Sequence, residues 1–220
     1  MTAIGVMLSG CGVKDGSEIH EAVLTLLFLD RRGAEIVCMA PDIQQQQVIN
    51  HLTGEKSDEQ RNVLVESARI ARGEIKDLKQ VSADDIDGLI LPGGFGAVTN
   101  LSDFASKGKD TRINEEVKRL LNEMVSSGKP VGAICIAPAT LAGAIRDRSP
   151  VVTIGNDMTT SRIIEEIGGR HQNCSVNEIH VDETNKLVTT PAYMLGPGIK
   201  DIAVGIEKLV DKIMDMTINT

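Results

Sequence analysis

Short runs of branched and other apolar residues recur along the chain, separated by polar segments. Each run is nearly continuous rather than alternating, which is typical of strands covered on both faces of a sheet. We therefore predict six buried strands, at residues 4–8, 36–39, 88–91, 131–134, 151–154 and 187–190.

Between several of these runs, apolar residues recur at the spacing of one helix face. One stripe consists of Ile19, Ala22, Val23, Leu26 and Leu27, with Asp15 or Ser17 as the candidate N-cap. A second consists of Val117, Leu120, Leu121, Met124 and Val125, and ends at Gly128 and Pro130. Residues 199–216 repeat the pattern. Strands alternating with helices predict an α/β fold with a mostly parallel sheet and helices on both faces.

Residues 42–85 fit this alternation less well. Residues 59–71 have the pattern of an amphipathic helix, and residues 72–78 could form an extra strand. We interpret the segment as a small insertion that helps to build or cover a site. No linker or repeat indicates a second domain, so residues 1–220 are expected to form one.

The composition narrows the class of protein further. A net charge of −8 without any basic block argues against a nucleic-acid or anionic-membrane partner. No apolar run is long enough for a membrane helix, and residues 1–8 resemble a first strand more than a signal peptide. The four cysteines lie far apart without a CxxC pair, which argues against a zinc site or a disulfide framework. We expect a reducing cytoplasm as the location.

Ligands of such sheets bind beyond the carboxyl ends of the strands. At one such end, residues 131–134 run directly into Cys135, and small residues with an early proline, Pro138, then begin a helix. A strand–turn–helix elbow of this kind presents a nucleophile, and a helix N-terminus favours a thiolate. The alternative is that Cys135 is a small buried apolar residue.

A second strand end carries the turn Leu91-Pro92-Gly93-Gly94-Phe95-Gly96. Successive glycines allow backbone N–H groups to converge on a developing negative charge. Gly93 and Gly94, with an N–H group near Ile136, could form an oxyanion hole. The alternative is a tight loop in which the glycines only permit positive φ angles.

Acidic residues open the first predicted helix. Carboxylates in a first turn usually stabilise the helix dipole, which suffices for Glu18. A carboxyl group buried beside Cys135 would instead hydrogen-bond to the sulfur or act as a base. Helical periodicity does not choose between Glu18 and Glu21.

These motifs resemble one family. Residues 5–12 and 16–23, the 91–96 turn with the following 100–104, and the Cys135-Ile136-Ala137-Pro138 elbow are similar to the enhancing-lycopene-biosynthesis proteins. Residues 51–55 and 62–72 resemble that family's own insertion. The family lies in the PfpI and class I glutamine amidotransferase-like superfamily. The resemblance implies a flavodoxin-like three-layer sandwich, usually assembled as a homodimer.

The resemblance also implies roles for individual residues. It makes Cys135 the nucleophile, Glu21 its acidic partner, and Gly93 and Gly94 the oxyanion donors. It further implies a glutathione-independent glyoxalase activity, which converts small dicarbonyls such as glyoxal and methylglyoxal to hydroxy acids without a metal or organic cofactor.

One departure separates this chain from other branches of the superfamily. Protease-like relatives carry a histidine directly after the cysteine, whereas this chain has Ile136. The one candidate for the amidotransferase His-x-Glu motif, at residues 180–183, has the wrong spacing and is expected in an exposed hairpin. His20, His51 and His171 are interpreted as surface or packing residues.

Two other functions therefore stay open at this point: a redox-responsive or small-molecule-binding regulator linked to isoprenoid metabolism, and a glutaminase-like amidotransferase subunit. Tyr193 and Cys11 follow strands and could line the site, although packing roles are expected for both.

Overall fold

The computed structural model describes residues 1–218, and a seven-stranded sheet runs through its centre, in the order β10-β11-β7-β6-β1-β2-β5. All neighbouring strands are parallel except the β10–β11 pair. The predicted α/β fold with a mostly parallel sheet is confirmed. The strands are β1 (Ala3–Met7), β2 (Glu35–Ala40), β5 (Lys76–Asp77), β6 (Gly88–Leu91), β7 (Val131–Ile134), β10 (His180–Asp182) and β11 (Leu187–Thr190).

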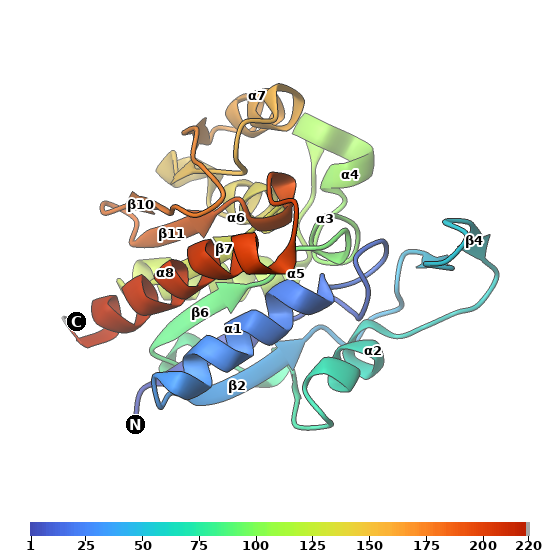
Figure 1. Ribbon diagram of the computed structural model, residues 1–220, viewed down its shortest axis with the longest axis horizontal. Coiled ribbons are helices and arrows are strands. Elements are labelled where there is room, and N and C mark those ends of the chain that lie inside the picture. The colour runs from blue at the N-terminus through green and yellow to red at the C-terminus, as the bar shows by residue number, and fades with distance from the viewer. Residues whose placement is uncertain (219–220) are drawn as a thin grey trace.

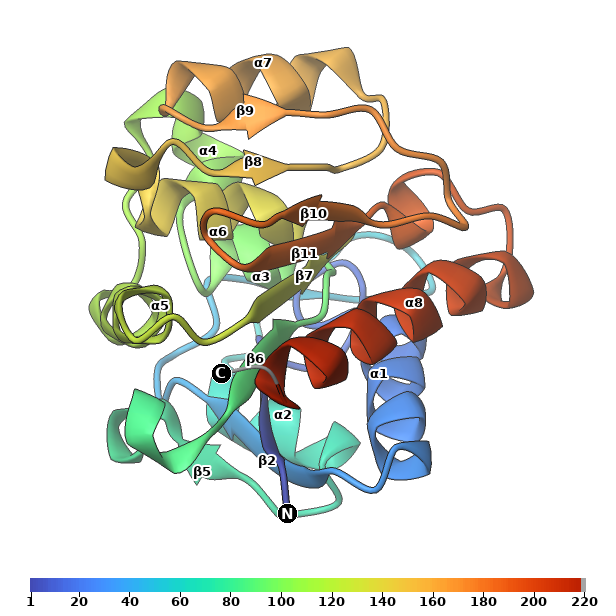
Figure 2. The same ribbon diagram turned by 90° about the vertical axis from the view of Figure 1, so that its left-hand side faces the viewer.

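Helices cover both faces of this sheet, as Figures 1 and 2 show. One face carries α1 (Ile19–Arg31), α2 (Val63–Ile70) and α8 (Ile199–Ile218), and the other carries α3 (Gly96–Thr99), α5 (Glu115–Ser126) and α6 (Ala137–Ala144). Each face has its own cluster of buried apolar side chains. The result is the expected flavodoxin-like three-layer sandwich, whose central strands β6, β7 and β11 are buried throughout.

Helix α5 shows why the sequence pattern located the helices. The Asn114 side chain caps it by accepting hydrogen bonds from the N–H groups of Glu116 and Val117. Burying its apolar stripe supplies the main stabilisation, because a short helix is marginal by itself in water. The buried residues are the predicted stripe: Val117, Leu120, Leu121, Met124 and Val125.

The prediction that residues 151–154 form a strand of the central sheet was wrong. Strand β8 covers only Val151–Val152 and pairs with β9 (Arg170–His171) in a separate two-stranded sheet. Helix α7 (Met158–Glu166) connects the two strands. The antiparallel hairpin of β10 and β11 already occupies the sheet edge beside β7, so β8 has no place there.

The segment expected to be an insertion, residues 42–85, contains α2, β5 and a projecting hairpin of β3 (Val48–Ile49) and β4 (Lys56–Ser57) (Figure 1). Helix α2 begins at Val63, later than predicted, because the Asn62 side chain caps it. The predicted extra strand is β5, which pairs with β2 at the edge of the central sheet.

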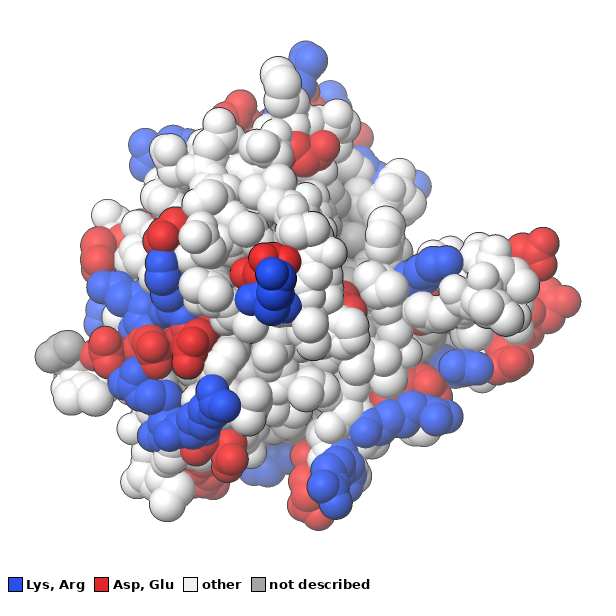
Figure 3. Space-filling view, viewed as in Figure 1, with Lys and Arg blue, Asp and Glu red and all other residues white. Residues whose placement is uncertain are grey.

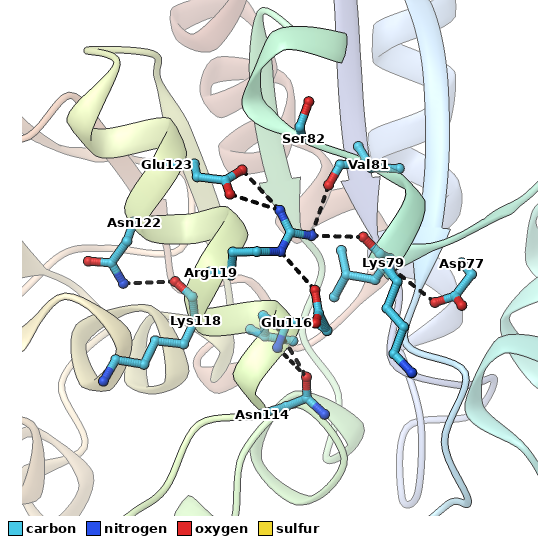
Figure 4. Close-up of polar contacts among 12 residues, drawn as sticks. Asp77, Lys79, Val81, Ser82, Asn114, Glu116, Lys118, Arg119, Asn122 and Glu123 are labelled. Carbon is cyan, nitrogen blue, oxygen red and sulfur yellow. Dashed lines mark hydrogen bonds and ion pairs between the residues drawn. The ribbon is translucent and has the colours of Figure 1, made fainter.

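Arg119 of α5 ties the end of this segment to the core (Figure 4). Its guanidinium group donates hydrogen bonds to the carbonyl oxygens of Leu78 and Val81, at 3.1 and 2.9 Å. It also donates to the carboxylates of Glu116 and Glu123. A planar guanidinium can satisfy all four acceptors at once, which a lysine cannot.

Charged side chains are of mixed sign in the view of Figure 3, where Lys and Arg alternate with Asp and Glu. None of the helices within residues 1–218 combines the length and apolarity that a bilayer crossing requires.

Candidate active site

Cys135 occupies the turn between β7 and α6 with a φ of +61°, a conformation that non-glycine residues rarely adopt. Its backbone N–H donates a 2.9 Å hydrogen bond to Thr190 at the end of β11, which fixes the turn against the neighbouring strand. Pro138 lies in the first turn of α6, as predicted. Strained backbone conformations of this kind cluster at active sites and ligand-binding sites.

The structure distinguishes the two candidate carboxylates. Glu21 is fully buried and hydrogen-bonded to Cys135. The backbone N–H groups of Tyr193 and Gly93 donate to its two oxygens, at 3.2 and 3.0 Å. Glu18 instead caps α1, because its side chain accepts the Glu21 N–H at 2.8 Å. Of the two, Glu21 is therefore the carboxyl group that lies beside the sulfur.

The expected N-caps of α1 were wrong. Ser17 accepts a hydrogen bond from the Ser9 N–H at 2.9 Å, and Asp15 accepts one from the Ile49 N–H at 2.7 Å. Both side chains hold the loop before the helix to other segments. Glu18 could take the cap because its backbone is extended, as an N-cap requires.

Gly93 and Gly94 both lie beside the Cys135 elbow, but their backbone N–H groups have different acceptors. The N–H of Gly93 is directed at Glu21, not at an oxyanion position as the sequence suggested. The N–H groups of Gly94 and Ile136 hydrogen-bond to the Cys135 sulfur. Residue 93 must be glycine, because a Cβ there would lie 2.5 Å from the Cys135 Cβ and 2.6 Å from Glu21 Oε2.

Burial is the largest influence on the pKa values of Glu21 and Cys135. It raises the pKa of Glu21 to about 8, against the opposing effect of the Tyr193 and Gly93 N–H groups. Burial and the neighbouring Glu21 also raise the pKa of Cys135, which outweighs the Gly94 and Ile136 N–H groups. The N–H of Ile136 at the start of α6 lowers the pKa of Cys135, as expected of a helix N-terminus, but burial and Glu21 outweigh it. The expected thiolate is therefore not favoured. The two groups titrate as a coupled pair that readily accepts only one negative charge.

Cys135 opens onto a cavity of about 540 Å³ with a mostly apolar wall. Tyr193 lies on this wall, and its hydroxyl group pairs with His20 Nδ1 at 2.7 Å. Cys11 is not part of the wall; the charged groups near it include Glu66 and Arg69 of α2. The other lining residues are Val13, Glu18, Gly94, Phe95, Val98, Phe104, Ala105, Gly108, Ile136, Asp157, Thr160, Ile163 and Met194.

Sequence reasoning missed most of this wall. Phe104 belongs to α4 (Phe104–Lys107), and Thr160 and Ile163 belong to α7, both far along the chain from the elbow. The backbone N–H of Tyr193 was missed as well, since an amide donor has no sequence signal. The wall residues that belong to turns predicted to matter are Gly94, Phe95, Cys135 and Ile136.

Known proteins are similar to this chain over nearly all of its length. It is 46% identical to the human glutamine amidotransferase-like class 1 domain-containing protein 3, mitochondrial, covering 97% of this chain and 83% of that protein. The ES1 protein homolog, mitochondrial, of Rattus norvegicus is also 46% identical, with 97% and 84% covered.

A crystal structure of the isoprenoid biosynthesis protein with amidotransferase-like domain from Ehrlichia chaffeensis superimposes with a TM-score of 0.92. It is 37% identical, and the match covers 98% of this chain and 99% of that one. The DJ-1/PfpI family model matches residues 12–189, which include the cysteine elbow, the diglycine turn and Glu21. The expected superfamily is confirmed, and the chain belongs to the DJ-1/PfpI family.

Proposed function

We propose that this protein is a cysteine-dependent glyoxalase that converts small 2-oxoaldehydes to 2-hydroxy acids without a metal or organic cofactor. One observation carries the proposal: a buried carboxyl group, Glu21, is hydrogen-bonded to a strained cysteine, Cys135, beside an open cavity. A thiol can add to an aldehyde, and a single acid–base group can then move a proton between two carbons.

The first step forms the carbon–sulfur bond. The Glu21 carboxylate accepts the thiol proton as the sulfur attacks the aldehyde carbon, and this proton passes to the former aldehyde oxygen. A group with a pKa of about 8 suits this exchange, because it both accepts and returns protons near neutral pH. The N–H groups of Gly94 and Ile136 stabilise the developing oxyanion.

The second step moves hydrogen within the adduct. The Glu21 carboxylate removes the proton from the carbon that bears sulfur, giving an enediol, and returns a proton to the adjacent carbon. The product is a thioester of the 2-hydroxy acid, and water hydrolyses it to release the acid and the Cys135 thiol. The aldehyde carbon is oxidised as the ketone carbon is reduced, so no external oxidant is consumed.

Lactate production from methylglyoxal tests the proposal. Cys135→Ser should abolish it, whereas Cys174→Ser, a partly exposed thiol that is not on the cavity wall, should leave it unchanged. Equal turnover by wild-type protein and Cys135→Ser would refute the mechanism.

The rival functions have less support. Glutaminase chemistry needs a histidine beside the cysteine, and no histidine within residues 1–218 lines the cavity. A redox regulator linked to isoprenoid metabolism needs a readily ionised thiol, whereas burial and Glu21 raise the pKa of Cys135. Selective peroxide modification of Cys135 with negligible dicarbonyl turnover would favour the regulator.

The family resemblance also leads us to propose a homodimer, testable by analytical ultracentrifugation. We propose a reducing compartment, the cytoplasm, as the location, because all four cysteines are free thiols. The human and rat relatives are named as mitochondrial proteins.

A further inference from the structure

The cavity beside Cys135 is much larger than a small dicarbonyl. Its volume is about 540 Å³, whereas one water molecule occupies about 30 Å³ of liquid. Methylglyoxal carries only one methyl group, so it would leave most of this space to water. A cavity of this size normally accommodates a drug-sized molecule.

The wall of the cavity is apolar where α3, α4 and α7 contribute to it. Phe95 and Val98 project from α3 and its start, Phe104 from α4, and Ile163 from α7. Phe104 is buried, and Ile163 packs against the same apolar cluster. Such a surface gains free energy by removing an apolar substituent from water.

The charge on the wall has one sign. Glu18 and Asp157 line the cavity, and no lysine, arginine or histidine among residues 1–218 does so. The hydrogen bonds from Thr160 hold the pKa of Asp157 below its usual range, so this exposed carboxylate is ionised at neutral pH. Lys107 lines a neighbouring hollow that shares Phe95 and Val98, but Cys135 is not part of that hollow.

From these observations we infer that the substrate is a neutral 2-oxoaldehyde with an aromatic or branched alkyl substituent, and that anionic substrates are rejected. This inference rests on the proposed function for its reactive group. The apolar walls of α3, α4 and α7 take the substituent, and Glu18 and Asp157 repel a carboxylate or phosphate.

Steady-state kinetics test both parts. Phenylglyoxal should have a kcat/KM at least about tenfold above methylglyoxal, since filling an apolar pocket changes discrimination by that order. Ile163→Asn should reduce this ratio severalfold. Val204→Asn, on the exposed side of α8, is the matched control and should keep the ratio. Equal kcat/KM values for the two substrates would overturn the inference while the proposed function stands.

The charge is tested with 4-carboxyphenylglyoxal, which should be at least tenfold poorer than phenylglyoxal. Asp157→Asn should raise its relative kcat/KM severalfold, and asparagine is an equally good N-cap for α7. Equal kcat/KM values for 4-carboxyphenylglyoxal and phenylglyoxal would overturn the charge argument. An unchanged ratio of these values in Asp157→Asn would overturn it as well.

A binding measurement separates this inference from the proposed function. In saturation-transfer NMR with the Cys135→Ala variant, acetophenone should bind, and benzoate and acetone should bind at least tenfold more weakly. If no dicarbonyl is turned over but acetophenone is selected, the proposed function fails and the ligand class stands. If acetophenone shows no preference over benzoate and acetone, the ligand class is wrong.

Discussion

The backbone N–H of Gly93 donates a 3.0 Å hydrogen bond to the carboxyl group of Glu21. Within the glycine turn after β6, the Gly93 N–H therefore holds Glu21, whereas the N–H groups of Gly94 and Ile136 are directed at the Cys135 sulfur. The Tyr193 N–H donates to the other carboxyl oxygen. Both oxygens of Glu21 are thus held by backbone N–H groups, which a side-chain substitution at residue 193 does not remove.

Gly93→Ala should lower kcat/KM for a dicarbonyl by at least about 100-fold, because the new Cβ would displace Cys135 or Glu21. Gly73→Ala is the control: residue 73 has a φ of +89°, and a Cβ added there would meet no other atom within 4 Å. We expect that control to lose about 1 kcal/mol of stability and no activity. Steady-state kinetics with chemical denaturation of each variant measure both effects, and a fully active Gly93→Ala would contradict the geometry.

Activity should rise with pH, because the carboxylate form of Glu21 takes the thiol proton. With a pKa raised to about 8 by burial, kcat/KM should increase up to about tenfold per pH unit below that value and level off above it. Glu21→Gln should reduce kcat/KM by about 100-fold or more and remove this dependence. An unaltered profile in Glu21→Gln would assign the titration to another group.

The same carboxyl group should make stability depend on pH. Its pKa in the folded protein, about 8, exceeds the ordinary value of 4.5, so the folded state binds more protons between those values. The stabilisation from Glu21 is thus fully present below about pH 4.5 and is lost as the pH rises towards 8. Relative to Glu21→Gln, the wild-type free energy of unfolding should fall by at most about 1.4 kcal/mol per pH unit in that window. Urea denaturation at several pH values measures this, and a difference that rises with pH would contradict the sign.

Tyr193→Phe should have little effect on catalysis. The substitution removes the 2.7 Å contact with His20 but keeps the backbone N–H that holds Glu21. We expect kcat/KM within about threefold of wild type, with the same pH profile. A loss above about 100-fold would instead assign the phenol a direct part in the reaction.

Arg119→Met should destabilise the protein by about 2–3 kcal/mol, because the Val81 carbonyl oxygen loses its donor and the Leu78 carbonyl oxygen keeps only the Val81 N–H. Arg162→Met is the matched control: its side chain is 81% exposed in its ion pair with Glu166, so the loss should stay below about 1 kcal/mol. Equal unfolding free energies for the two variants would show that the hydrogen bonds of Arg119 stabilise the fold no more than an exposed ion pair does.

Local sequence patterns predicted the elements well where one face of an element is buried. The stripe from Val117 to Val125 forms α5, and the run into Cys135 forms β7 and the elbow. The local patterns gave the wrong result at residues 151–154. Segments that are distant in sequence compete for the edge of a sheet, and a local pattern does not show which of them pairs there. In this case the β10–β11 hairpin occupies the place.

By itself, the sequence determined the α/β class, the cysteine at a strand end and the glycine turn that meets it. These features follow from short-range burial patterns and backbone freedom, which neighbouring residues encode. Only the tertiary structure decided that Glu21 rather than Glu18 reaches the sulfur, that Gly93 serves the carboxyl group, and that α4 and α7 complete an acidic, apolar cavity. These outcomes depend on how helices rotate and pack against one sheet edge, and no local pattern specifies that packing.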